Sequence, residues 1–197
     1  MTLVTYDFPN SVQETICSFK FGMPPKIVLY NNTVTKSKDE FEQDVPKDML
    51  TDECYTEPSM DPYKYLFNEN SFDFKGFIFD KKYVFVRTTL EKLFPVLLHE
   101  IGHFKTDDAY EGWDPEIIKK QEIFAHEWAL DKIFRLDKAE WFESYISILK
   151  QISLKEGTTQ EAANTTLQYF STFDYSALRH HFLKVSKFKF KTQKLTI

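Results

Sequence analysis

Cysteine and glycine are scarce in this chain of 197 residues, which contains two and five of them. Two cysteines are too few for a disulfide scaffold, so we expect a reducing, cytoplasmic setting. No apolar run reaches the roughly 18 residues that a membrane span requires, so none is expected. Hydrophobic residues make up 42% of the chain and aromatic residues 17%. This composition excludes an intrinsically disordered protein and predicts a globular one.

Histidine is also scarce, with five residues in all, yet two of them stand in the pentapeptide His-Glu-Ile-Gly-His at residues 99–103. Positions i and i+4 of a helix lie on one face, so His99 and His103 can bind a single zinc ion. Glu100 directly follows the first histidine and is placed to act as general base on a water at the metal. This pattern predicts a zinc-dependent hydrolysis of peptide bonds.

A third metal ligand must come from another part of the chain, because a catalytic zinc site uses three protein ligands and one open position. Glu122 follows His103 with the spacing HExxH-x18-E, which is typical of gluzincin metallopeptidases. His126 lies one turn further along the same predicted helix, so it could replace Glu122 or bind to a ligand as an outer partner. Asp107 and Asp108 are nearer to the motif in sequence, but they lie where the helix of the HExxH motif is expected to end.

Together these residues resemble the ImmA/IrrE-type metallopeptidases, in which an HE[LI]GH helix precedes a helix of the form E-x-x-A-N-x-F-A. Residues 122–129 read E-I-F-A-H-E-W-A, so Glu122, Ala125 and Ala129 match, and His126 replaces the usual asparagine. The match is strong only over residues 96–130. The resemblance implies a gluzincin-like zinc endopeptidase that cleaves a specific regulatory protein, such as a helix-turn-helix repressor.

Hydrolysis also needs a donor that stabilises the oxyanion, and the candidates are Tyr110, His180 and His181. A different function is suggested by the C-terminal end, where residues 177–197 contain six lysines and arginines and no acidic residue. A basic tail can contact nucleic acid. The alternative to an enzyme is therefore a regulatory or DNA-binding module with a peptidase-like fold and little or no turnover.

The expected fold class is α+β: a mostly helical, zincin-like domain with a small antiparallel or mixed sheet beside the helix of the HExxH motif. We expect a domain over residues 1–152, containing a long acidic loop at 34–70, and a C-terminal helical subdomain at 153–197.

A hairpin is predicted at 76–86, and one of its strands is expected to pair with an extended substrate. Helices are predicted at 11–21, 46–50, 95–104, 115–134, 137–152, 158–170 and 175–185, and a strand at 26–30. A cap at Thr88 is predicted to lead into the helix of the HExxH motif, with a break near Phe94 so that Pro95 opens the helix proper. Asp114 is predicted to cap the helix at 115–134, and Asp137 the one after it. On the helix at 115–134, Glu127 and Asp131 are expected to be solvated.

Overall fold

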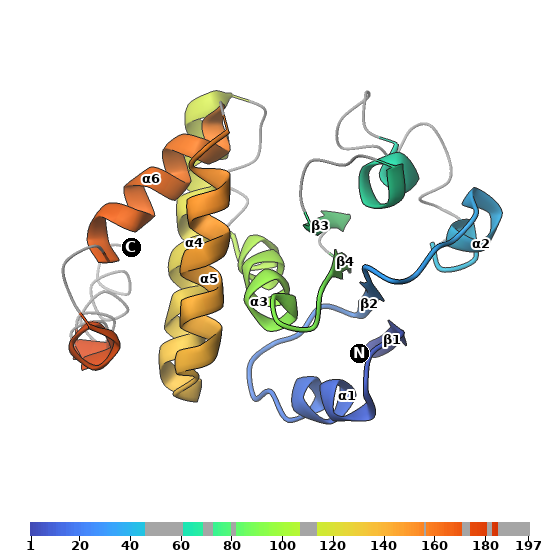
Figure 1. Cartoon of the computed structure of the whole chain (residues 1–197), viewed down its shortest axis with the longest axis horizontal. Coiled ribbons are helices and arrows are strands. Elements are labelled where there is room, and N and C mark those ends of the chain that lie inside the picture. Colours follow the sequence, from blue (N-terminus) through green and yellow to red (C-terminus); the bar gives the residue numbers. More distant parts are fainter. Residues whose placement is uncertain are drawn as a thin grey trace, which may run out of the picture. The chain divides into compact units, whose positions relative to one another are not determined.

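The computed structural model describes residues 1–45, 61–68, 73–79, 82–106, 114–155, 157–170, 174–180 and 183–184. The chain divides into two compact units, Met1–Glu100 and Ile101–Ile197, and the division lies inside helix α3 (Leu93–Phe104). Figure 1 shows a small sheet and several helices, so the predicted α+β class is confirmed. Among the described residues, no helix has the length and apolar character that crossing a membrane requires.

The first unit contains a four-stranded mixed sheet with the order β1-β2-β4-β3. The strands are β1 (Thr2–Tyr6), β2 (Lys26–Asn31), β3 (Phe74–Phe79) and β4 (Tyr83–Thr88). β2 pairs in parallel with β1 and β4, whereas β3 and β4 form the predicted antiparallel hairpin. Residues 27–30 of β2 are fully buried, because this strand has neighbours at both edges and its apolar run is covered on both faces. The strand β1 was not predicted.

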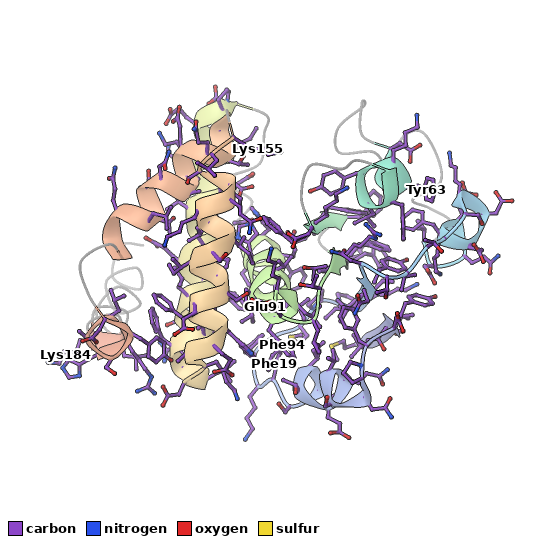
Figure 2. All side chains as sticks on the ribbon, viewed as in Figure 1. Phe19, Tyr63, Glu91, Phe94, Lys155 and Lys184 are labelled. Carbon is purple, nitrogen blue, oxygen red and sulfur yellow. The ribbon has the colours of Figure 1, made fainter. Side chains whose placement is uncertain are left out.

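One face of the sheet is covered by the segment that the sequence analysis assigned to a long loop. This segment contains helix α2 (Lys38–Glu42), which begins with a capping box between Ser37 and Glu40, and the helical turn η3 (Lys64–Asn68). Tyr63, labelled in Figure 2, stacks on Phe67 with ring centroids 5.5 Å apart and donates a hydrogen bond to the Lys36 carbonyl. The segment is therefore part of the apolar core where it is described. The helix predicted at 46–50 lies outside the described residues.

Helix α1 (Asn10–Cys17) connects β1 to β2 and ends earlier than the predicted residue 21. Beyond it Phe19 stacks on Phe21, and it also meets Phe94 edge-on at a centroid distance of 6.3 Å. Figure 2 labels Phe19 and Phe94 beside each other. The chain leaves the helix because these aromatic rings pack against the start of α3.

The start of α3 corrects a second prediction. Thr88 was expected to cap this helix, but it is the last residue of β4, and a turn over residues 89–92 separates the two elements. Pro95 is the third residue of α3. In the first turn of a helix the missing N–H of proline costs no intrahelical hydrogen bond. The helix was predicted to open at Pro95, and the observed start at Leu93 is two residues earlier.

The second unit contains α4 (Pro115–Leu136), α5 (Ala139–Ile152) and α6 (Thr158–Phe170), which pack against one another (Figure 1). As predicted, Asp114 caps α4, accepting a hydrogen bond from the Glu116 amide at 2.9 Å. Asp137 was expected to begin the next helix. It instead ends α4 in the left-handed conformation, with φ of 55°, which aspartate tolerates better than most residues. The domain boundary predicted at residue 152 remains a prediction.

Candidate metal centre

The two histidines of the HExxH motif lie one turn apart on α3, and this helix passes very close to α4. A Cβ atom at Gly102 would lie 2.8 Å from both the Cα and the carbonyl oxygen of Ala125. Only glycine allows two backbones to come this close. Since Gly102 precedes His103, and Ala125 lies between Glu122 and His126, this contact brings the predicted ligands of α3 and α4 together.

The distances between these side chains are short. Nε2 of His103 lies 3.4 Å from Oε1 of Glu122, and Nε2 of His126 lies 4.0 Å from Oε2 of the same carboxylate. Within the second unit, His103, Glu122 and His126 therefore form a group of potential metal ligands. The structure therefore places Glu122 between two histidines, His103 and His126.

The chemistry and spacing of this group fit a zinc ion. Imidazole nitrogen and carboxylate oxygen are common zinc donors, whereas calcium and magnesium prefer sites made of oxygen atoms alone. With zinc–ligand bonds of about 2.0–2.1 Å, two ligand atoms at the corners of a tetrahedron are about 3.4 Å apart. The separation of 3.4 Å between His103 and Glu122 matches that value. His99, His103, Glu122 and His126 are the residues that could hold the ion.

Glu100 of α3 packs against strand β3. It is 8% exposed, and a Cβ atom at Gly76 would come within 2.6 Å of its Cγ and Oε1 atoms. The absence of a side chain at residue 76 therefore creates the space that the Glu100 side chain occupies. β3 is an edge strand of the sheet, so Glu100 lies beside backbone groups at the sheet edge.

His126 has a hydrogen-bond partner that the sequence analysis missed. Its Nδ1 atom lies 2.7 Å from the hydroxyl oxygen of Tyr145 on α5, and both residues are 1% exposed. Tyr145 belongs to a regular apolar stripe of α5, and such a position predicts a core residue. No sequence pattern reveals this pair, because 19 residues separate its members and only the packing of α4 on α5 brings them together.

The remaining candidates are placed elsewhere or lie outside the described residues. Tyr110, His181, Asp107 and Asp108 belong to the latter group. His180 is exposed and lines an open cleft that includes Asp137 at the C-terminal end of α4. At 1.5 Å per helical residue, Asp137 is roughly 20 Å along α4 from Glu122. The structure therefore does not bring His180 to the metal ligands.

Two acidic residues of α4 were expected to be solvated, and this holds for only one of them. Glu127 is exposed, as predicted. The prediction for Asp131 is wrong, because it is 6% exposed and accepts hydrogen bonds from Lys132 at 2.7 Å and Arg135 at 2.8 Å. The two cations compensate the burial of this carboxylate, which the sequence pattern alone did not reveal.

No protein-family model, no curated protein and no solved structure matches this chain. The resemblance to the ImmA/IrrE-type metallopeptidases is thus not tested by such comparisons.

Proposed function

We propose that the protein is a zinc-dependent endopeptidase with a gluzincin-like site, of the kind found in the ImmA/IrrE-type metallopeptidases. The single observation that supports this most is the position of Glu122. A carboxylate from a second helix lies 3.4 Å from His103, at the sequence spacing that gluzincins use for their third ligand. If the HExxH motif had arisen by chance, a carboxylate at this sequence spacing and this distance from His103 would not be expected.

In this proposal His99, His103 and Glu122 hold the zinc ion, which acts as a Lewis acid on the scissile carbonyl and makes water more acidic. Glu100 accepts the proton of the attacking water and then delivers it to the leaving amine. The position of Glu100 beside Gly76 supports this role, because the carboxylate is held at the edge of the sheet rather than free in solvent.

The substrate is proposed to be a specific regulatory protein, such as a helix-turn-helix repressor. An extended peptide segment could add to the edge strand β3, with backbone hydrogen bonds that do not depend on its sequence. This strand is preferred to β4, which has a neighbour on both sides. The substrate segment would then pass directly beside Glu100.

The test is to incubate the zinc-loaded protein with a repressor encoded by a neighbouring gene and to compare wild type with Glu100→Gln. Loss of a general base should reduce turnover by roughly 10²- to 10⁴-fold, while the zinc content stays unchanged. Glu127→Gln is the matched control, since it makes the same chemical change at an exposed residue of α4.

Two results would contradict the proposal. One is full peptidase activity in Glu100→Gln, which would remove the proposed base from the reaction. The other is native wild-type protein that neither contains zinc nor takes it up, because all the proposed chemistry depends on the ion.

A further inference from the structure

The metal group contains one histidine more than the proposed peptidase site requires. α3 supplies His99 and His103 at positions i and i+4, and α4 supplies Glu122 and His126 with the same spacing. Such a pair lies on one face of its helix. Each helix therefore offers two ligands to the same region, and the close contact of Gly102 with Ala125 joins the two pairs.

His126 lies at the buried side of this group. Its side chain is 2% exposed, compared with 18% for Glu122 and 21% for His103. The 4.0 Å between Nε2 of His126 and Oε2 of Glu122 exceeds a normal hydrogen-bond length. It leaves room for a cation to contact both atoms. His103 and Glu122 are the more exposed members of the group.

The hydrogen bond to Tyr145 fixes which nitrogen of His126 faces the group. Because the Nδ1 atom is 2.7 Å from the tyrosine hydroxyl, the Nε2 atom is directed towards Glu122. A histidine that binds a metal through Nε2 carries its proton on Nδ1, and an outer partner that accepts this proton holds the ring in place. The oxygen of Tyr145 is positioned to be that acceptor.

We propose that His126 is a further metal ligand, binding through Nε2 together with His103 and Glu122, and that Tyr145 is its positioning residue. This inference rests on the proposed function, because it concerns the same zinc ion. It adds a ligand at the position where the resembling family has asparagine. The water of the proposed reaction would then be a fifth ligand, a coordination number that zinc can reach in catalytic sites.

The experiment measures zinc affinity by competition with a chromophoric chelator, and the visible absorption of the protein loaded with Co²⁺. The variants are His126→Asn, Tyr145→Phe and the double variant. Removal of an outer partner typically weakens metal binding by 10- to 100-fold, so we expect about this loss for Tyr145→Phe and a larger loss for His126→Asn. His126→Asn should also shift the Co²⁺ absorption bands, since a nitrogen ligand is replaced.

The double variant separates a positioning role from a purely structural one. If Tyr145 acts through His126, adding Tyr145→Phe to His126→Asn should cause no further loss of zinc affinity. Tyr30→Phe is the control, because it also removes a buried tyrosine hydroxyl, but one that bonds to Asp44. It should leave zinc affinity and the Co²⁺ spectrum unchanged.

Three outcomes lead to different conclusions. Wild-type zinc affinity in both single variants would overturn the inference. A loss for His126→Asn no larger than for Tyr145→Phe, with an unchanged Co²⁺ spectrum, would also overturn it, since His126 would then be an outer partner only. A wild-type protein that binds no zinc would instead overturn the proposed function itself. Should His126→Asn fail to fold, Tyr145→Phe still tests the inference through zinc affinity.

Discussion

At the scale of single residues, a dense set of polar contacts among the described residues of the first unit surrounds Asp44. This carboxylate is 8% exposed and accepts hydrogen bonds from the hydroxyl groups of Tyr6 and Tyr30 and from the ammonium group of Lys36. The Lys26 ammonium group donates to its backbone carbonyl. A buried carboxylate is tolerated only with such partners, so Asp44 fixes the segment after α2 to the sheet.

Replacing Asp44 by alanine should destabilise the protein by about 3 kcal/mol, because the substitution leaves the largely buried Lys36 without its counter-charge. Urea unfolding followed by circular dichroism measures this change. Asp39→Ala is the control, since Asp39 is an exposed acid of the neighbouring helix α2 and should cost about 0.5 kcal/mol or less. Equal effects of the two substitutions would contradict the assigned role of Asp44.

The same cluster predicts a loss of stability in alkaline solution. Burial, followed by the hydrogen bond to Asp44, raises the pKa of Tyr30 above its ordinary value of 10.0. Burial lowers the pKa of Lys36, but its bonds to Asp44 and Tyr6 outweigh that effect, and the net pKa is raised. A raised pKa means that the folded state holds its proton more tightly than the unfolded state. The contribution is complete below about pH 10 and is lost as the pH rises towards the raised values.

This pH dependence can be measured with urea unfolding at pH 8 and at about pH 10.5. Wild type should lose more unfolding free energy between the two conditions than Tyr30→Phe, which has one fewer group to ionise. An equal loss in both proteins would show that Tyr30 does not contribute to the alkaline destabilisation.

At the scale of secondary-structure elements, α3 packs against two neighbouring elements. Towards α4 it presents His103, and Gly102 allows the close approach. Towards β3 it presents Glu100, which occupies the space above Gly76. Two of the five glycines in the chain therefore stand where a Cβ atom would displace the helix or its proposed base.

Gly76→Ala should reduce peptidase turnover by roughly 100-fold, since a displacement of about 1 Å in a catalytic group has an effect of this size. The new Cβ would lie 2.6–2.7 Å from three atoms of the Glu100 side chain, which must move, and no metal ligand is among these three nearest atoms. Zinc affinity should therefore stay at the wild-type level. Steady-state kinetics and zinc titration measure the two quantities.

Ile78→Val on the same strand is the control for Gly76→Ala, because it adds no atom next to Glu100. It should retain turnover close to that of wild type. Wild-type turnover in Gly76→Ala would show that the position of Glu100 at this strand is not required for the reaction.

At the scale of the whole molecule, the apolar cores do not depend on the metal group. In the part of the chain that the structure describes, the core cluster of the sheet contains the buried residues Val28, Tyr30, Phe41, Val45, Leu66, Phe79 and Phe85. α4, α5 and α6 bury a further set of apolar side chains against one another. These cores should keep the protein folded without zinc, and the metal should add stability to a structure that already exists.

Zinc should therefore raise the unfolding free energy by about 2.7 kcal/mol when the free ion is at 100 times its dissociation constant. Removal of zinc by a chelator should reverse this stabilisation and leave the far-ultraviolet circular dichroism spectrum largely unchanged. Thermal unfolding with and without zinc is the measurement. Magnesium should have no comparable effect, because three of the four candidate ligands are histidines.

Two variants control the zinc experiment. His103→Ala should remove most of the stabilisation, whereas His180→Ala should retain it, because His180 is exposed and lies near the end of α4. Complete unfolding of the metal-free protein would contradict the prediction that the apolar cores are sufficient.

Local patterns in the sequence predict the elements that are stabilised by residues close together in the chain. The apolar run of β2, the hairpin of β3 and β4, and the cap of α4 at Asp114 all depend on residues close together in the chain, and their predictions are confirmed. β1 was missed because its partner is β2, about 24 residues away, and an isolated edge strand has little pattern of its own. Asp131 and Asp137 were misassigned because their surroundings come from packing and from the end of α4.

The same distinction between local pattern and long-range packing applies to the candidate site. By itself the sequence determined that His99, His103 and Glu100 share one helix, and that Glu122 and His126 share another, since helical spacing is a local property. Only the tertiary structure decided that these helices touch at Gly102 and Ala125, that Glu100 lies over Gly76, and that Tyr145 bonds to His126. These contacts join residues far apart in the chain, and the packing that forms them depends on the shapes of many side chains at once.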